Sequence, residues 1–440
     1  MKRSQWMRRT AVVTALALSV AACGTDDGDE ADEPDEPVAE EPDDGDDDEG
    51  EDLEAAEGDG ILQLGYILPE SGPLEFLGPP QIETVRLAVE EINAAGGVLG
   101  NDVELFDGDE AGDTAVAAEE ASRLVNEGVD AIIGAAASGM SLAFVDAVTD
   151  AGVLQCSGSN TAPTFTDNDY NGLYTRTAPT DALQGPVLAE AIIDDGNAAV
   201  AILARADDYG QGLLEATEEA LTESGADVVF SETYDAEAQT FDAEVDAVAS
   251  SNPDAVVLIS FEEGGQILAT MIEAGFGPQD IAIYGADGTA GGDFVEAVDP
   301  NDPSAVEGMR GTRPGGSPDS EFVQRYEEGT GLTDTTFAAN IYDCVNIIAI
   351  AAEIAQSDLG SDIVAEMENV TSEGGTECSD FASCKEAIDA GDDVTYDPAS
   401  GSVLTETDAG NLEPESGTYE VWEFNADGEV EVESSVQSNF

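Results

Sequence analysis

Hydroxyl-bearing residues follow two of the apolar runs in the sequence, at positions where a small anion could bind. Ser138 comes directly after AIIGAAA, and the polar group Ser159, Asn160 and Thr161 follows GVLQC. Hydroxyl groups and free backbone N–H groups at the starts of helices can hold a carboxylate without a cation. These residues therefore predict a carboxylate sub-site, with ordinary helix capping as the simpler alternative for each serine and threonine.

Acidic and aromatic residues follow other apolar runs. Asp287 comes after AIYGA and offers a fixed negative charge that suits an ammonium group. Asp181 follows LYTRTAPT, and Tyr209 follows AILARADD. Taken singly, Asp287 could shape a turn and Tyr209 could pack in a core. Together, a carboxylate sub-site and an ammonium sub-site that face each other are the arrangement expected of a receptor for a free amino acid.

The sequence offers little that could perform catalysis. It contains no His, which removes the commonest general base and metal ligand. It has no G-x-S-x-G motif and no cluster of metal-ligand residues. No G-x-G-x-x-G or G-x-x-x-x-G-K-[ST] motif follows an apolar run, so neither a dinucleotide nor a nucleoside triphosphate site is supported. We therefore expect a binding protein that is not an enzyme and needs no cofactor or metal.

The candidate residues must be positioned by the elements that alternate along the chain. From residue 61 onward, short apolar runs such as ILQLGYIL alternate with amphipathic stretches such as IETVRLAVEEINAAGG. This alternation predicts parallel sheets covered by helices on both faces and joined by right-handed crossovers. The length favours two α/β lobes, each a doubly wound parallel sheet. Ligands of such sheets bind beyond the carboxyl ends of the strands, which is where the candidate residues stand.

The charge of the chain limits its partners. It has 97 acidic and 12 basic residues and a formal net charge of -85. A surface of this sign repels the phosphate backbone, so nucleic acid is excluded as a partner, and close contact with anionic lipid is opposed. Salt would screen the self-repulsion, since the Debye length falls to about 3 Å at molar concentration. We expect a halophilic acidic surface, with a mesophilic acidic protein as the alternative.

The N-terminal residues are typical of an exported protein. An apolar run over residues 11–20 is too short to span a membrane, and four basic residues precede it. The order Val20-Ala21-Ala22-Cys23 resembles the lipobox of bacterial lipoproteins. We expect a signal peptide over 1–22, a lipidated Cys23, and an acidic disordered tether over 23–60. The protein would then lie on the extracellular or periplasmic face of the cell membrane. An ordinary signal peptide with an incidental Cys is the alternative.

Four cysteines remain of the five once Cys23 is assigned to lipid. In an oxidising compartment four cysteines allow three pairings. Cys378 and Cys384 can close a small loop in CSDFASC, which leaves Cys156 with Cys344. Two buried free thiols at 156 and 344 are the alternative.

A longer pattern resembles a known family. The run GYILPESGPLEFLGPPQIETVRLAVEEINAAGGVLG resembles the opening of the periplasmic leucine/isoleucine/valine-binding proteins, the solute-binding components of branched-chain amino acid ABC transporters. The resemblance continues through DYGQG, FEEGGQIL and IYGADG to TYEVWEFNADGEV. It implies a three-crossover hinge of periplasmic-binding-protein type I, with crossings near residues 181, 311 and 397. Lobe 1 would contain residues 61–181 and 312–396, and lobe 2 would contain 182–311 and 397–440.

The resemblance also implies roles for individual residues. Ser138 and the segment 159–161 would hold the ligand carboxylate, and Asp287 in the other lobe would meet the ammonium group. Asp181 occupies another contacting position. Tyr209 would close over the ligand, with Phe261 near a further aromatic position.

Other positions depart from the family pattern. Phe76 and Leu77 stand near a position where the family has tyrosine, and Met140 stands in a run that is usually serine. The selectivity for the ligand side chain therefore does not carry over.

These features predict a monomeric receptor that passes a free amino acid, most simply a branched-chain one or a related amide, to an ABC transporter permease. The membrane would be contacted only through the lipid anchor. A sensor that transmits the same lobe closure to a signalling partner is one alternative, and a receptor for a neutral amide or sugar is another. An extracellular hydrolase is disfavoured because no nucleophile with a base can be found.

Overall fold

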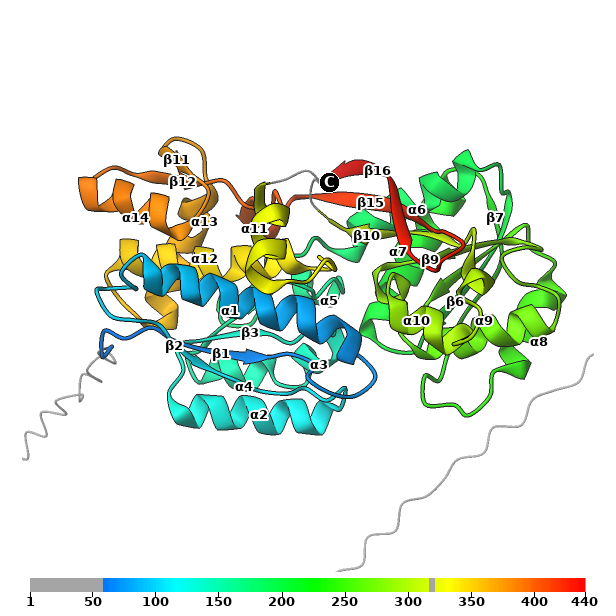
Figure 1. The fold of residues 1–440 in the computed structure, drawn as a ribbon, viewed down its shortest axis with the longest axis horizontal. Helices are drawn as coiled ribbons and strands as arrows, with labels where there is room; N and C mark the ends of the chain where they lie inside the picture. The colour runs from blue at the N-terminus through cyan, green and yellow to red at the C-terminus, as the bar shows by residue number, and fades with distance from the viewer. Residues whose placement is uncertain (1–57, 316–320, 440) are drawn as a thin grey trace, which may run out of the picture. The chain divides into compact units, whose positions relative to one another are not determined.

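The computed structural model describes residues 58–315 and 321–439. The predicted signal peptide, Cys23 and most of the predicted tether lie outside these residues. The described chain forms two seven-stranded sheets and a small two-stranded sheet (Figure 1). The small sheet pairs β11 (Thr376–Cys378) with β12 (Val394–Tyr396) in parallel.

The first sheet has the strand order β13-β14-β5-β4-β3-β1-β2. All neighbouring strands are parallel except β13 and β14. Its strands are β1 (Gln63–Ile67), β2 (Glu104–Phe106), β3 (Ala131–Gly134), β4 (Leu154–Ser157), β5 (Tyr174–Arg176), β13 (Leu404–Glu406) and β14 (Leu412–Pro414).

Helices cover both faces of the first sheet, as the apolar runs predict. Ile133 of β3 packs with α1 and α12 in one buried cluster, whereas its neighbour Ile132 packs with α2 and α4 in another. Figure 1 shows α1 and α2 on opposite sides of β1 and β3. Successive side chains of a strand point to opposite faces, so a strand buried on both sides must be apolar throughout. The helices in this part of the chain are α1 (Gly78–Ala94), α2 (Thr114–Glu127), α3 (Ser138–Leu142), α4 (Val145–Asp150), α5 (Thr164–Asp167), α11 (Glu321–Thr330), α12 (Ala338–Ala355), α13 (Gly360–Thr371) and α14 (Phe381–Ala390).

The second sheet repeats this topology with the order β16-β15-β10-β9-β8-β6-β7. Strands β6 to β10 are parallel, and β15 and β16 form an antiparallel hairpin on β10. Its strands are β6 (Ala199–Arg205), β7 (Asp227–Tyr234), β8 (Ala255–Ile259), β9 (Ala282–Gly285), β10 (Arg310–Pro314), β15 (Ser416–Phe424) and β16 (Val430–Asn439).

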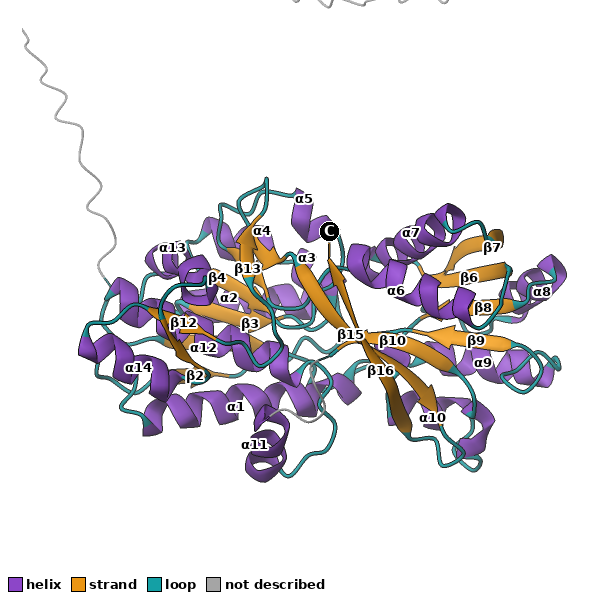
Figure 2. Cartoon of the chain, turned by 90° about the horizontal axis from the view of Figure 1, so that it is seen from above, coloured by secondary structure: helices purple, strands orange, loops and turns teal. Residues whose placement is uncertain are grey.

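Helices also cover both faces of the second sheet. Ile202 of β6 packs with α6 and α7, and the next residue, Leu203, packs with α8 and α9. Figure 2 shows α7 and α9 on opposite sides of β6 and β8. The two sheets and their helices confirm the predicted doubly wound α/β fold. The helices in this part of the chain are α6 (Asp181–Asp194), α7 (Asp208–Glu223), α8 (Asp242–Ser251), α9 (Glu263–Glu273) and α10 (Gly292–Val298), with the 3₁₀ turns η2 (Asp287–Thr289) and η3 (Pro303–Val306). A further 3₁₀ turn, η1 (Glu75–Leu77), directly precedes α1.

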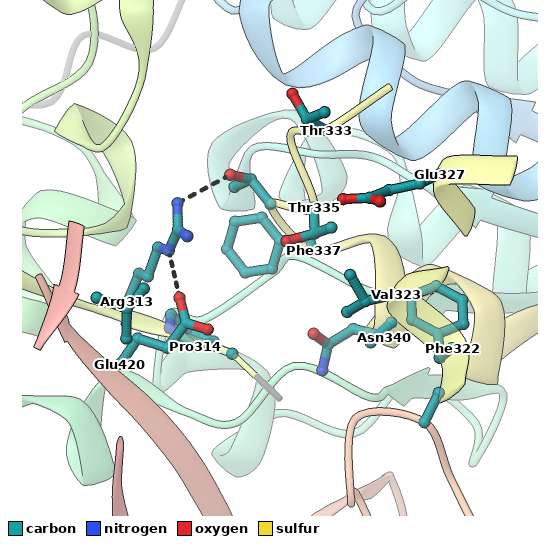
Figure 3. A pocket seen from close by; sticks show the side chains of 15 residues that line it. Arg313, Pro314, Phe322, Val323, Glu327, Thr333, Thr335, Phe337, Asn340 and Glu420 are labelled. Carbon is teal, nitrogen blue, oxygen red and sulfur yellow. Dashed lines mark hydrogen bonds and ion pairs between the residues drawn. The ribbon is translucent and has the colours of Figure 1, made fainter. Parts of the chain in front are cut away.

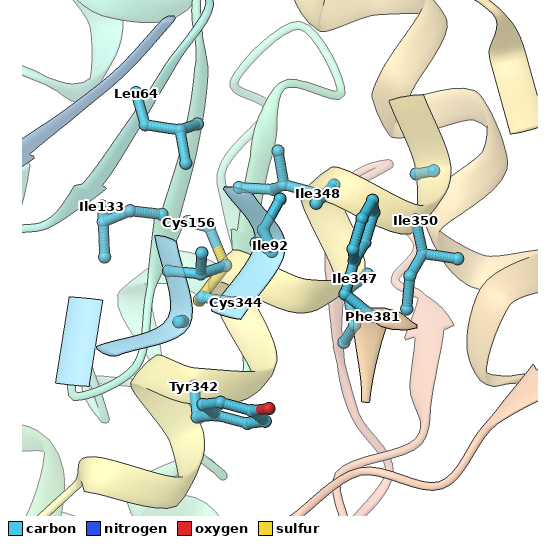
Figure 4. Close-up of a cluster of buried hydrophobic side chains, with 14 of the residues drawn as sticks. Leu64, Ile92, Ile133, Cys156, Tyr342, Cys344, Ile347, Ile348, Ile350 and Phe381 are labelled. Atoms are coloured by element: carbon cyan, nitrogen blue, oxygen red, sulfur yellow. A yellow bond between two sulfur atoms is a disulfide. The ribbon is translucent and has the colours of Figure 1, made fainter. Parts of the chain in front are cut away.

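Helix α12 lies in the core beside the first sheet. It is long and apolar enough to span a membrane, but 83% of it is buried inside the protein, which is typical of a core helix. Cys344 of α12 faces Cys156 of β4 at disulfide distance, with Cα atoms 5.9 Å apart (Figure 4). Cys378 and Cys384 form the second such pair, at 5.1 Å. Both pairs are the ones predicted from the sequence.

The strand pairing corrects one predicted boundary. The sequence places residues 397–440 in the second lobe, but β13 and β14 belong to the first sheet, where Leu412 pairs with Thr175 of β5. The chain therefore crosses to the second sheet for the last time between Pro414 of β14 and Ser416 of β15. Two three-residue strands give too short an apolar pattern to predict, and their pairing depends on a strand more than 200 residues away.

Candidate ligand-binding site

The predicted site residues all stand just beyond the carboxyl ends of parallel strands. In the first sheet, Ser138 follows β3, the segment 159–161 follows β4, and Asp181 follows β5. In the second sheet, Tyr209 follows β6, Phe261 follows β8, and Asp287 follows β9. Each of these side chains belongs to a residue that is at most 6% exposed. All six strand ends therefore contribute buried residues.

The carboxylate side of the site is built from the loops after β3 and β4. Ser138 is the first residue of α3, and its Oγ accepts a hydrogen bond from the N–H of Ala162 at 3.3 Å. The Oγ of Ser159 lies 3.0 Å from both Gln81 Oε1 and the carbonyl oxygen of Ala136. These bonds hold the two loops together and occupy the single O–H of Ser159, whereas the Ser138 hydroxyl accepts a bond and keeps its own proton available.

Asn160 has a different role from the other predicted residues. Its side-chain amide donates to the carbonyl oxygens of Ala135 and Ala136 at 3.0 and 3.1 Å, and its Oδ1 accepts from the Tyr174 hydroxyl at 3.1 Å. Both amide hydrogens and the carbonyl oxygen are thus committed to the protein. Its backbone N–H also donates to Ser157 Oγ at 3.1 Å, and its carbonyl oxygen accepts from Arg176 Nη1 at 3.3 Å, so Asn160 shapes the loop.

Asp287 sits in a polar setting on the second sheet. Its Oδ1 accepts hydrogen bonds from Gln184 Nε2 at 3.0 Å and from the Tyr209 hydroxyl at 3.2 Å. Burial raises the pKa of Asp287 to about 6, and the bond from Gln184 opposes that rise. Asp287 is therefore ionised at neutral pH and is held in place by two neutral donors.

Asp181 is the most unusual group of the site. It is fully buried, and the only side chain among the described residues that acts on its carboxylate as a hydrogen-bond donor is Thr161, whose bond opposes the rise in pKa but falls outside ordinary hydrogen-bond geometry. Its backbone N–H donates to the carbonyl oxygen of Thr161 at 2.8 Å, which ties it to the loop after β4. Burial raises its pKa well above the usual value, and the charge of Asp287 raises it further. This shift favours the protonated, neutral form of Asp181, so the negative charge of the site is carried by Asp287.

The nearby arginines do not neutralise the two acids. Arg176 is paired with Glu413, and Arg313 is paired with Glu420 at 2.8 Å. No ion pair between described residues includes Asp181 or Asp287. The site therefore carries buried negative charge that an incoming ammonium group can balance.

An apolar wall adjoins the acidic groups. The rings of Tyr209 and Phe261 stack with centroids 5.2 Å apart and planes within 3°. The same buried cluster contains Leu74, Leu77 and Phe337, with Phe76 and Met140 packed against it. The residues that depart from the family pattern thus add apolar surface beside the site.

Gln184 and Glu110 are site neighbours that the sequence reasoning missed. Gln184, on the first turn of α6, bonds Asp287, and its own Oε1 has no partner among the described residues. Glu110 is fully buried, and its Oε2 accepts from the N–H of Ala136 at 2.8 Å, two residues before Ser138. Burial raises the pKa of Glu110 to about 8. In a chain with 97 acidic residues, no local pattern separates Glu110 from its exposed neighbours.

Two cavities lie close to the site residues. One of about 860 Å³ opens beside Phe261 and is lined from both parts of the chain, by residues that include Met140 and Arg205. The other, of about 250 Å³, is lined by Arg313, Phe337 and Glu420 and by none of the predicted site residues (Figure 3). The first is therefore the cavity that borders the candidate site, and we call it the mouth cavity.

Two doubly wound sheets whose strand ends enclose a buried polar site define a two-sheet α/β solute-binding protein. The family model described as periplasmic binding protein matches residues 62–387, and the chain belongs to this family. It is 32% identical over 228 residues to the Leu/Ile/Val-binding protein of Escherichia coli. That match covers 50% of this chain and 62% of the relative.

Solved structures show the same fold. A leucine-binding protein from Thermotoga maritima is similar with a TM-score of 0.71 and 24% identity, over 86% of this chain and 99% of that chain. A branched-chain amino acid transporter substrate-binding protein from Streptococcus pneumoniae, solved with isoleucine, has a TM-score of 0.70 and 24% identity, over 86% and 100%. These likenesses confirm the predicted fold.

Proposed function

We propose that this protein is the solute-binding component of an ABC importer and that it binds a free amino acid with an apolar side chain. The observation that carries the proposal is Asp287, a buried carboxylate that is held by the neutral donors Gln184 and Tyr209 and forms no ion pair with a described Arg or Lys. An ammonium group would balance the charge of Asp287, and the Ser138 hydroxyl, which only accepts a bond within the protein, would donate to the ligand carboxylate.

The ligand class follows from the remaining contacts. The apolar wall of Tyr209, Phe261 and their neighbours favours an aliphatic side chain. The names of the relatives agree with an aliphatic ligand, since one is a Leu/Ile/Val-binding protein and a structural neighbour was solved with isoleucine. A neutral amide or a sugar is the second candidate, but it would leave the buried charge of Asp287 unbalanced.

The proposal extends to the setting of the protein. The lipobox at Cys23 supports a lipid anchor on the extracellular or periplasmic face, and the family supports an extracytoplasmic place. The partners would be a permease and the membrane through the anchor, with the protein a monomer and both cysteine pairs oxidised. The alternative is a sensor that transmits the closure of the two lobes to a signalling partner and not to a permease. Mass spectrometry of the membrane fraction tests the anchor, because an unmodified Cys23 would contradict it.

Calorimetry with matched ligands tests the binding proposal. The purified full-length chain in molar salt is titrated with L-leucine, with 4-methylpentanoate, which lacks only the ammonium group, and with 3-methylbutylamine, which lacks only the carboxylate. We expect leucine to bind at least about 100-fold more tightly than either analogue, since each loses a charge-assisted set of bonds. Equal binding of leucine and 4-methylpentanoate would contradict the ammonium sub-site.

A further inference from the structure

Arg205 stands at the border between the mouth cavity and the candidate site. It is the last residue of β6, and its side chain is 15% exposed. Its Nε donates to Asp207 Oδ2 at 2.5 Å, and its Nη1 donates to Glu263 Oε1 at 2.8 Å. Two carboxylates from different loops therefore fix the plane of the guanidinium group.

The fixed guanidinium lies on an aromatic stack. The Arg205 Cζ atom is 3.7 Å from the centroid of the Phe261 ring, well within the range of a cation–π contact. Phe261 in turn stacks on Tyr209 with nearly parallel planes. Glu263 Oε1, which holds Arg205, also accepts from the backbone N–H of Phe261 at 3.3 Å. Arg205 thus contacts the Phe261 ring directly and shares a carboxylate with the Phe261 backbone.

The stack ends at the ammonium sub-site. The Tyr209 hydroxyl donates to Asp287 Oδ1 at 3.2 Å and lies 3.4 Å from the N–H of Gly288. Phe261 also packs tightly against this turn, because a Cβ atom added at Gly288 would lie 2.6 Å from Phe261 Cδ1. Any tilt of the Phe261 ring would therefore move both Tyr209 and the turn that carries Asp287.

We propose that Arg205 is a positioning residue for amino-acid binding: through Phe261 and Tyr209 it orients Asp287 toward the ligand. Asp207 and Glu263 already pair with the charge of Arg205. The part of Arg205 that acts on the site is therefore the flat face of the guanidinium group, which contacts the Phe261 ring. This inference rests on the proposed function, in which Asp287 receives the ammonium group.

A double-mutant cycle tests whether Arg205 acts through the stack. The full chain, Arg205→Gln, Phe261→Leu and the double variant are titrated with L-leucine in molar salt. We expect Arg205→Gln to weaken binding about threefold to thirtyfold, the range that a cation–π contact covers. In the Phe261→Leu background the same change should weaken binding less than about twofold. Equal losses in the two backgrounds would overturn the proposal, since Arg205 would then act independently of Phe261.

Two further measurements separate this proposal from the proposed function. Arg123→Gln is the matched control, because Arg123 also bridges two carboxylates but lies on the surface of α2; it should leave leucine binding unchanged. A crystal structure of Arg205→Gln without ligand needs no binding at all. We expect the Tyr209 hydroxyl to have moved beyond 3.5 Å from Asp287, and an unchanged contact would overturn the proposal even if the parent chain binds no amino acid.

Discussion

The Tyr209 hydroxyl donates a hydrogen bond to Asp287 at 3.2 Å, from the first turn of α7 to the turn after β9. Gln184 donates to the same carboxylate oxygen. Asp287 is thus held by neutral groups, while no described Arg or Lys forms an ion pair with it. A buried carboxylate with this set of partners keeps its charge for a ligand.

Replacing Asp287 should remove the ammonium sub-site with little effect on the fold. Asp287→Asn keeps the shape of the side chain and removes the charge. Truncating one partner of a buried charge pair costs about 2 to 5 kcal/mol, so we expect leucine affinity to fall by a factor of tens to thousands. Ser138→Ala removes one hydroxyl bond and should cost less, about 1.5 to 3 kcal/mol. Calorimetry measures both, with the exposed Asp427→Asn as control. Unchanged binding by Asp287→Asn would argue for a neutral ligand.

Leucine affinity should depend on the protonation of Asp287. Burial raises the pKa of Asp287 to about 6 in the ligand-free protein. A protonated carboxyl group cannot balance an ammonium group, so protonation competes with binding. We expect affinity to be flat above about pH 7 and to fall up to about tenfold per unit below pH 6. Asp287→Asn should bind weakly at every pH. An affinity that stayed constant from pH 8 to 5 would rule out Asp287 as the titrating group.

Glu110 should make the protein less stable as pH rises. Burial raises the pKa of Glu110 from 4.5 to about 8. Between these values the unfolded state loses its proton and the folded state keeps it, so unfolding becomes more favourable with each step in pH. We expect Glu110→Gln to reduce this fall in Tm between pH 5 and 8 at constant salt. The exposed Glu104→Gln serves as control. Parallel Tm curves for Glu110→Gln and the parent would contradict the assignment.

Salt should stabilise the fold by screening the acidic excess. The chain carries 97 acidic and 12 basic residues, and self-repulsion weakens as the Debye length falls from about 10 Å at 0.1 M to about 3 Å at 1 M. We expect Tm to rise from low to molar potassium chloride. Sucrose at matched osmolality is the control, because it cannot screen charge. A rise with sucrose as large as with salt would show that exclusion of the solute, and not screening, is responsible.

The two cysteine pairs should differ in their effect on stability. Cys156 and Cys344 are 188 residues apart, whereas Cys378 and Cys384 are 6 apart. Loop-closure entropy grows with the length of the closed loop and corresponds to about 5 kcal/mol for the long loop and about 2 kcal/mol for the short one. We expect the double serine variant of the long pair to lower Tm more than that of the short pair. The opposite order would indicate that the long disulfide is not formed.

The sequence alone determined the two doubly wound sheets and which candidate residues stand at the strand ends. Strands apolar on both faces and separated by amphipathic helices can be buried only in parallel sheets, and parallel strands bring their carboxyl ends to one edge. Strand-end positions such as Ser138 in the first sheet and Asp287 in the second could therefore be predicted from the sequence.

Only the tertiary structure decided how each member is used. The Asn160 side chain is hydrogen-bonded to neighbouring loops, Asp181 is buried close enough to Asp287 to feel its charge, and Gln184 is brought to Asp287 from a helix 103 residues earlier in the chain. In the same way β14 joins β5 and moves the last crossing beyond Pro414. Hydrogen bonding, burial and charge coupling depend on which groups packing brings within a few ångströms, and neither apolar periodicity nor residue type along the chain specifies those distances.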